Sequence, residues 1–346
     1  MIKNSLKKNI TAGLAVIFLL SSCNNNEKML DSLADYNNSK EEKGYHFGEE
    51  LKLPKEVTDR AETITISFGD KETSNLKVDP AFFTLGDNDV TFIVKTKSGE
   101  TLNQDATINV FANSPEQNIP YDIVADYPHD PTNFVEGFLL EGNTVYESAG
   151  LDGASKLIKY TLGSSVPGLI EKQPANIFSE GCAIAGDKIY QLTYKNKIGF
   201  VYDKNSLKKL SEFPLPNVIG EGWGLTYNGK NLIATDGSKN LFYLDVNDPS
   251  KVVRTVAVAG HAEIYDNINE LEYHNGYIYS NVWHKPVILK INPKTGEVVG
   301  KFDFTKLTQE NDQGNSEYVL NGIAFKGDHM LVTGKNWSKI YEIAIK

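Results

Sequence analysis

The feature that most constrains this chain is a repeat in its last two thirds. A glycine turn followed by a short apolar strand occurs at intervals of 44, 43, 47 and 51 residues, at Gly142, Gly186, Gly229, Gly276 and Gly327. A period of about 40–50 residues built from short strands is typical of β-propellers, in which each repeat forms one four-stranded sheet. The sequence therefore predicts a five-bladed β-propeller over residues 118–346.

Residues 46–114 follow a different pattern. Apolar and polar residues alternate at 63–68, 90–94 and 107–111, and turn residues bound each stretch. Short alternating strands in so small a segment are typical of a β-sandwich. We expect a small immunoglobulin-like β-sandwich, similar to the modules that many bacterial surface lipoproteins carry. No reactive side chains cluster in it, which favours a spacer or docking role, and the predicted fold class is all-β.

The first 22 residues have the order of a secretory signal peptide: three lysines without an acid, a short apolar run, and then small residues. The apolar run is too short to cross a hydrocarbon core of about 30 Å. Residues 20–23, Leu-Ser-Ser-Cys, resemble the lipobox of bacterial lipoproteins, so we expect Cys23 to carry the lipid. The alternative is an ordinary signal peptide with an incidental cysteine. Residues 23–45 are polar, which predicts a flexible tether.

These features predict a lipid-anchored protein of the bacterial cell envelope, on its periplasmic face or at the cell surface. The formal net charge of −10 offers no basic excess for phosphates, so nucleic acid is excluded as a partner. An acidic body is also repelled by anionic lipid, so acyl chains alone should hold it at the membrane. With Cys23 modified, Cys182 has no disulfide partner, and the fold must rest on packed apolar area. We expect a monomer.

A polar tract precedes each glycine turn. Each tract carries a carboxylate or a carboxamide at nearly the same register, mostly beside a glycine, in residues 133–137, 177–181, 220–224, 268–272 and 319–322. The innermost strands of a propeller line one channel, so these side chains should converge. Buried carboxylates cost several kcal/mol unless they are hydrogen-bonded, paired or bound to a cation. Any single acid is best interpreted as a cap on backbone donors, whereas the whole ring indicates a binding site.

Aromatic residues accompany these tracts. Tyr194, Trp223, Trp283 and Trp337 lie at strand ends or in the turns that follow. Tryptophan usually fills a core or an interface. Aromatic residues at matching positions of successive repeats more plausibly line a pocket for a small organic ligand.

Residues 119–346 resemble the plant-type glutaminyl-peptide cyclotransferases (glutamine cyclotransferases), a family of five-bladed propellers from plants and bacteria. The resemblance rests on eight motifs that occur in order, at residues 129–137, 178–181, 191–195, 221–226, 235–238, 269–273, 281–283 and 333–337. It implies that an N-terminal glutaminyl residue is converted to pyroglutamate with release of ammonia. Peptides or proteins with such a terminus are the implied partners.

The resemblance also implies roles for single residues. Glu180 matches the catalytic acid, which takes a proton from the α-amine and returns one to the leaving amide nitrogen. Asn269 matches a residue that positions the substrate amide, and Lys335 one that holds a substrate carbonyl or supports the developing charge. The aromatic walls correspond to Phe134, Phe178, Trp223 and Trp283. No cofactor is required for catalysis, and a structural calcium ion in the channel is expected, with ligands unknown.

Two substrate-binding positions depart from the family pattern: Glu136 replaces the usual Gln, and Tyr194 replaces the usual Trp. A second carboxylate near Glu180 should raise one of the two pKa values. These departures leave open a surface lipoprotein that binds peptide or glycan through a decayed site. A lactonase-like hydrolase with a channel metal is a third hypothesis, although such sites usually need more carboxylates. The six histidines are dispersed and are interpreted as surface residues.

Overall fold

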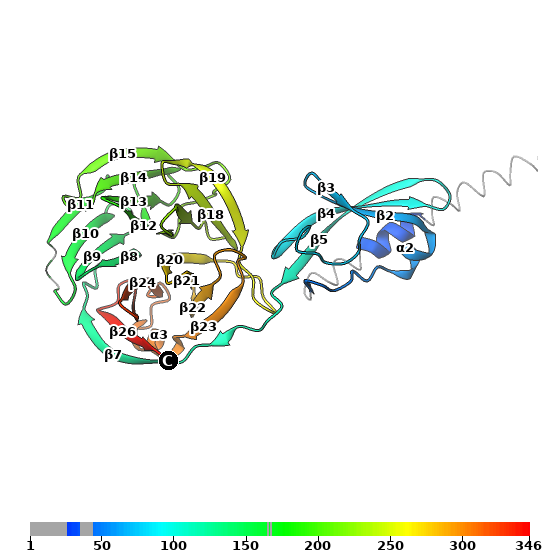
Figure 1. Ribbon diagram of the computed structural model, residues 1–346. Helices are drawn as coiled ribbons and strands as arrows, with labels where there is room; N and C mark the ends of the chain where they lie inside the picture. The colour runs from blue at the N-terminus through cyan, green and yellow to red at the C-terminus, as the bar shows by residue number, and fades with distance from the viewer. Residues whose placement is uncertain (1–25, 35–43, 165, 167) are drawn as a thin grey trace, which may run out of the picture. The chain divides into compact units, whose positions relative to one another are not determined.

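The computed structural model describes residues 26–34, 44–164, 166 and 168–346. The chain divides into two units, Met1–Phe111 and Ala112–Lys346, shown as a ribbon in Figure 1. The predicted signal peptide and Cys23 lie outside the described residues. In the part that is described, no helix has the length and apolar character needed to cross a membrane.

The first unit is built on one five-stranded sheet in its described residues. The strand order is β1-β5-β4-β2-β3, with the short helix α2 (Lys55–Arg60) before β2. The strands are β1 (Tyr45–His46), β2 (Ala61–Phe68), β3 (Lys71–Thr73), β4 (Gly86–Thr96) and β5 (Thr101–Phe111). Burial alternates along β4, as the sequence pattern predicted for a strand with one buried face. The three predicted strands lie within β2, β4 and β5, but two facing sheets are not seen, so the immunoglobulin-like sandwich is not confirmed.

Part of the predicted flexible tether is helical, which corrects the expectation for those residues. Residues 26–34 form a helix in which Met29 and Leu33 are buried. The two side chains are four residues apart and therefore share one helix face. The polar composition of the segment concealed this short apolar stripe.

The described residues of the second unit form five sheets. Their orders are β11-β10-β9-β8, β12-β13-β14-β15, β16-β17-β18-β19, β20-β21-β22-β23-β6 and β24-β25-β26-β7. The first two sheets contain β8 (Val135–Glu141), β9 (Thr144–Ala149), β10 (Lys156–Thr161), β11 (Leu169–Lys172), β12 (Ser179–Ala185), β13 (Lys188–Thr193), β14 (Ile198–Asp203) and β15 (Lys209–Pro214). The third contains β16 (Leu225–Tyr227), β17 (Asn231–Ala234), β18 (Asn240–Asp245) and β19 (Asp248–Ala257). The last two contain β20 (Ile268–His274), β21 (Tyr277–Val282), β22 (Lys285–Ile291), β23 (Val298–Asp303), β6 (Gln117–Asn118), β24 (Leu320–Lys326), β25 (His329–Gly334), β26 (Lys339–Ile345) and β7 (Tyr121–Pro128), and α3 (Thr305–Asn311) connects them.

The five sheets form a closed, β-propeller-like ring. The inner strands contact one another in the order β8, β12, β16, β20, β24 and back to β8, and Figure 1 shows the sheets around a common centre. The last sheet is completed by β7, which pairs with β26 from Tyr121↔Ile345 to Pro128↔Lys339. A strand from near the start of this unit thus pairs with its last strand and joins the two ends.

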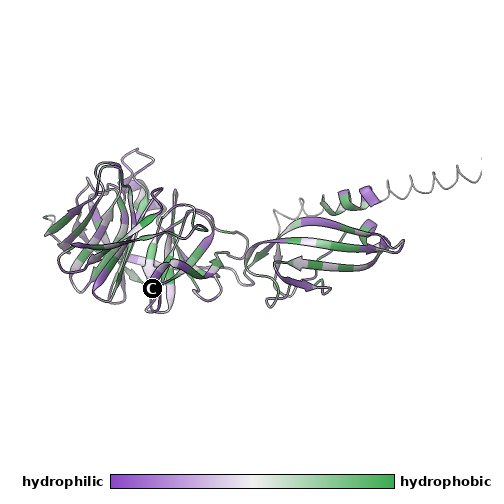
Figure 2. Cartoon of the chain, turned by 90° about the horizontal axis from the view of Figure 1, so that it is seen from above, coloured by the Kyte–Doolittle hydropathy of each residue, from purple (hydrophilic) through white to green (hydrophobic). Residues whose placement is uncertain are grey.

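The apolar core of the ring is divided among the joints between the sheets. Each neighbouring pair of sheets encloses its own cluster of buried side chains. Cys182 belongs to the cluster between the β8 and β12 sheets and is a free, fully buried thiol. Figure 2 shows that hydrophobic and hydrophilic residues are interspersed along the strands, so the strands that form these clusters also carry polar residues.

Glycine allows the inner strands to approach closely. A Cβ atom on Gly224 would lie 2.0 Å from the backbone oxygen of Asn269, and one on Gly181 would lie 2.5 Å from the nitrogen of Leu225. In both cases the obstructing atom belongs to the backbone of the neighbouring sheet. Gly181 and Gly224, two glycines of the polar tracts, are therefore required by the packing of the ring.

The change Gly224→Ala should destabilise this unit by about 1–3 kcal/mol, because overpacking against fixed backbone forces the strands apart. Urea denaturation followed by tryptophan fluorescence measures the effect, since all three tryptophans lie in Ala112–Lys346. Gly220→Ala is the matched control: the nearest atom to its added Cβ would be a side-chain oxygen 3.7 Å away. Equal midpoints for the two variants would contradict the role given to Gly224.

Candidate active site

A cavity of about 350 Å³ lies in the second unit. All nine residues to which the family resemblance assigned a role in catalysis or substrate binding line it. The lining residues are Phe134, Glu136, Leu151, Phe178, Glu180, Tyr194, Trp223, Asn269, Trp283, Glu317 and Lys335. The structure therefore brings together nine predicted residues from widely separated parts of the chain.

The polar residues occupy irregular positions of the inner strands. Strand pairing shifts its register at Glu136 in β8, at Glu180 in β12 and at Asn269 in β20. A shift of this kind, as in a β-bulge, re-aims a side chain that regular pairing would direct elsewhere. These irregularities explain how three strand residues reach one cavity while they remain 2%, 6% and 3% exposed.

Lys335 and Glu136 form a buried ion pair. The ammonium Nζ of Lys335 donates to Glu136 Oε1 at 2.7 Å, and Asn321 Nδ2 donates to Glu136 Oε2 at 3.2 Å. The same ammonium lies 4.5 Å from the centroid of the Phe134 ring. The carboxylate that departs from the family pattern thus forms an ion pair with the predicted site cation.

Glu180 is the acid best placed to exchange protons. Burial raises its pKa well above the ordinary range of a carboxyl group, and the negative charge of Glu136 raises it further. This agrees with the expectation that a second carboxylate near Glu180 raises one of the two pKa values. A carboxyl group with a raised pKa holds and releases a proton nearer to neutral pH.

Asn269 offers an unused hydrogen-bond acceptor. Its Oδ1 atom is buried and has no hydrogen-bond partner among the described residues. The backbone carbonyl of the same residue accepts a hydrogen bond from Thr235 Oγ1 at 3.0 Å, which anchors this part of β20. A buried acceptor without a partner costs free energy, and a ligand N–H group would relieve that cost.

Aromatic side chains make up much of the cavity wall. Trp223 and Trp283 meet edge to face at 5.6 Å between ring centroids. Phe178 lies 6.3 Å from Phe134 and 5.7 Å from Tyr194. Apolar walls of this kind exclude water from a ligand and hold it in a defined orientation.

Other predicted residues lie elsewhere. Trp337 is fully buried in the cluster between the last two sheets, so its interpretation as a pocket residue was wrong. His129 is buried rather than at the surface, because a carboxylate on β9 pairs with it. Glu270 caps backbone donors, since it accepts hydrogen bonds from the amides of Phe138 and Ile323 at 3.3 and 3.0 Å. Glu221 is half-buried and accepts a hydrogen bond from Trp223 Nε1 at 3.3 Å.

Sequence reasoning missed two lining residues, Leu151 and Glu317. Both lie in connections between strands, outside the polar tracts that carried the signal, and Leu151 has a positive φ of 89°. Within the described ranges, no three His, Cys, Asp or Glu side chains lie together in a way that could hold a metal ion. The channel calcium ion expected from the family resemblance stays a prediction.

Comparison with known proteins gives the family. The family model described as glutamine cyclotransferase matches residues 93–345. Over 232 residues the chain is 35% identical to a glutaminyl-peptide cyclotransferase of Arabidopsis thaliana, which covers 65% of this chain and 71% of the plant protein. A crystal structure of Myxococcus xanthus glutaminyl cyclase matches with a TM-score of 0.62 and 32% identity, over 67% of this chain and 98% of that one. The chain belongs to the glutamine cyclotransferase family.

Proposed function

We infer that this chain is an enzyme, a glutaminyl-peptide cyclotransferase, which converts an N-terminal glutaminyl residue to pyroglutamate and releases ammonia. The observation that carries the inference is the aromatic cavity in which the buried acid Glu180 and the unpaired Oδ1 of Asn269 lie together. We also propose that the five sheets are the blades of a five-bladed propeller, which the closed circuit of inner strands supports.

Glu180 is the proposed proton carrier. The α-amine of a peptide has a pKa of about 7.7–8.0, so its ammonium form must lose a proton before the nitrogen can attack. The Glu180 carboxylate accepts a proton from the amine as the nitrogen bonds to the side-chain carbonyl carbon. The same group then donates a proton to the departing nitrogen, the carbon–nitrogen bond breaks, and ammonia leaves.

The remaining site residues orient the substrate in this proposal. Asn269 Oδ1 accepts a hydrogen bond from the substrate's amide group, which aims the carbonyl carbon at the amine. Phe134, Phe178, Tyr194, Trp223 and Trp283 keep the side chain folded back and exclude water. Lys335, paired with Glu136, places positive charge near the cavity and supports charge that develops on the carbonyl oxygen. None of these steps requires a cofactor.

The change Glu180→Gln should lower kcat for ammonia release from a glutaminyl peptide by about 10²–10⁴-fold, the contribution typical of general acid–base catalysis. A coupled ammonia assay measures it, and Glu212→Gln, on the outer strand β15, is the control that should retain full activity. Full turnover by Glu180→Gln would reject the proposed role. Peptide binding by calorimetry without turnover of the unaltered chain would favour the alternative of a binding protein.

The change Glu136→Gln should move the acid limb of the kcat/KM profile to lower pH. Glu180 must be ionised to accept a proton, and activity is therefore lost as pH falls through its pKa. Removing the charge of Glu136 removes one cause that raises this pKa and leaves Lys335 free to lower it. A limb that stays in place or moves to higher pH would show that Glu180 does not govern the profile.

We further propose that Cys23 carries a lipid anchor and that the substrates are exported peptides or proteins. The lipobox-like residues 20–23 support this. In a bacterial host, Cys23→Ser should shift the chain from the detergent phase to the aqueous phase in detergent phase separation. The reason is that serine lacks the thiol to which the lipid is attached. Ser22→Ala retains the cysteine and a small neighbour, and should stay in the detergent phase. Aqueous partitioning of the unaltered chain would contradict the anchor.

A further inference from the structure

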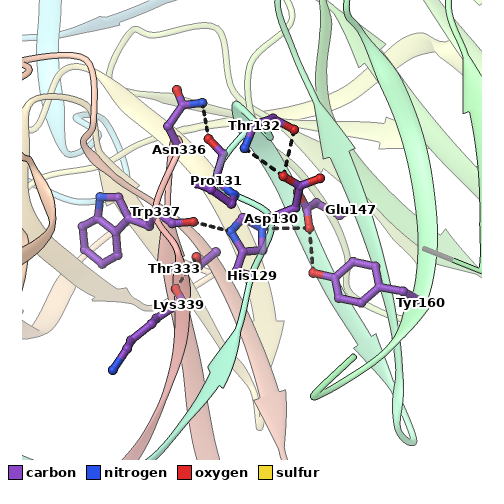
Figure 3. Close-up of polar contacts among 10 residues, drawn as sticks. All are labelled: His129, Asp130, Pro131, Thr132, Glu147, Tyr160, Thr333, Asn336, Trp337 and Lys339. Atoms are coloured by element: carbon purple, nitrogen blue, oxygen red, sulfur yellow. Dashed lines mark hydrogen bonds and ion pairs between the residues drawn. The ribbon is translucent and has the colours of Figure 1, made fainter. Parts of the chain in front are cut away.

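A buried polar cluster lies beside the site, where the ends of the second unit meet. His129 directly follows β7, Glu147 lies on β9 and Tyr160 on β10 (Figure 3). His129 Nε2 is 3.1 Å from Glu147 Oε2, to which the Tyr160 hydroxyl also donates at 2.7 Å. His129 Nδ1 is 2.6 Å from the backbone oxygen of Trp337. The His129 and Glu147 side chains are inaccessible to solvent.

Both ring nitrogens of His129 face acceptors. A carbonyl oxygen can only accept, so Nδ1 must carry hydrogen to bond Trp337, and Nε2 faces a carboxylate. Two donating nitrogens are the property of an imidazolium. Burial alone would lower the pKa of His129, but the charge of Glu147, the hydrogen bond to it and the Trp337 carbonyl together raise it. The pKa of Glu147 is lowered, because His129 and the hydrogen bonds of His129 and Tyr160 outweigh the effect of burial.

The Trp337 carbonyl connects this cluster to Lys335. Trp337 lies two residues after Lys335, in the connection between β25 and β26. The same connection bonds the segment after β7 at three further points. His129 N donates to the Ser338 carbonyl at 3.0 Å, Asn336 N to the Asn133 carbonyl at 2.9 Å, and Asn336 Nδ2 to the Pro131 carbonyl at 2.9 Å.

The two joined segments supply one wall of the cavity. The segment 129–133 runs directly into Phe134 and Glu136, and the other segment carries Lys335. The Lys335–Glu136 pair at 2.7 Å and the Lys335–Phe134 contact at 4.5 Å depend on how these segments are held together. A displacement of about 1 Å in such a constellation can cost on the order of 10²-fold in rate.

We propose that His129 is a positioning residue: its Nδ1–H bond to the Trp337 carbonyl holds the segment of Lys335 against the segment of Phe134 and Glu136. Glu147 orients the ring, and its negative charge stabilises the imidazolium form, in which Nδ1 as well as Nε2 carries hydrogen. The inference rests on the proposed function, and it assigns to His129 an influence on turnover without contact with the substrate.

A purely structural role makes a different prediction. In that case His129 serves as the counter-ion of buried Glu147, and its Nε2 contact is the important one. The two roles assign importance to different ring nitrogens, so variants that retain one nitrogen each can separate them.

The amide nitrogen of asparagine lies near the place of imidazole Nδ1, and that of glutamine near Nε2. His129→Asn therefore retains the donor to the Trp337 carbonyl and leaves Glu147 without its ion-pair partner. His129→Gln retains a donor to Glu147 and loses the hydrogen bond to the Trp337 carbonyl. We expect His129→Asn to have the lower Tm but a kcat within about threefold of the unaltered chain, and His129→Gln to lose about tenfold or more in kcat. Activity is normalised to the folded fraction from near-ultraviolet circular dichroism.

An activity order that follows the stability order would overturn the positioning role. His329→Asn is the matched control, because His329 also faces a glutamate, Glu342 Oε1 at 2.6 Å, but is 43% exposed and lies outside the cavity. It should change neither kcat nor KM.

A second measurement does not depend on variants. Nitrogen-15 NMR of the unaltered chain at pH 7 should show both nitrogens of His129 protonated, and an Nδ1 without hydrogen would overturn the proposal. Absence of ammonia release by the unaltered chain would reject the proposed function and the positioning role with it. Normal turnover combined with equal kcat values for the two His129 variants would reject the positioning role alone.

Discussion

The hydrogen bonds between β7 and β26 hold the second unit in the form on which its site depends. Residues from opposite ends of this unit pair along seven positions, and the pairing turns an open array of sheets into a ring. Closure protects sheet edges that would otherwise invite pairing with other chains. It also brings the segment after β7 to the connection after β25, so that Glu136 and Lys335, 199 residues apart, meet across 2.7 Å. The chemistry of the cavity is therefore a consequence of ring topology.

Within the ring, the polar groups act as a set because the strands that carry them are irregular at equivalent places. Glu136, Glu180 and Asn269 occupy register shifts, and Asn321 occupies a fourth. The set combines one carboxylate neutralised by an ammonium, one acid whose pKa burial and a neighbouring charge raise, and one carboxamide with an unused acceptor. Their different surroundings give chemically similar side chains different roles. This division of roles suits a reaction that moves a proton between two nitrogens of one substrate.

Much of this arrangement could be predicted from the sequence, and the reasons are physical. Repeats force equivalent strands to equivalent places, so the polar tracts before the glycine turns predicted which side chains share the cavity, Glu180 and Asn269 among them. The pairing partners of these side chains could not be predicted, because a repeat determines position along a strand but not which charges meet across the ring. Lys335 was predicted to hold a substrate carbonyl or to support the developing charge, and its ion pair with Glu136 was not foreseen. His129 was interpreted as a surface residue although it is buried. Leu151 and Glu317 lie in connections between strands, where the sequence does not follow the repeat, so their place in the cavity wall could not be predicted.

The layered core protects the thiol of Cys182 from oxidation, which matters outside the cytoplasm, where the proposed anchor would place the chain. The thiol is fully buried between the β8 and β12 sheets, and burial raises its pKa well above the usual range. Nucleophilic attack requires the thiolate, so the Cys182 sulfur of the folded chain is unreactive toward oxidants and other chains. That protection begins only when the two sheets have packed. In the oxidising compartment that the proposed anchor implies, the Cys182 thiol would be open to oxidation until then, and the packing of these two sheets would protect it from forming mixed disulfides.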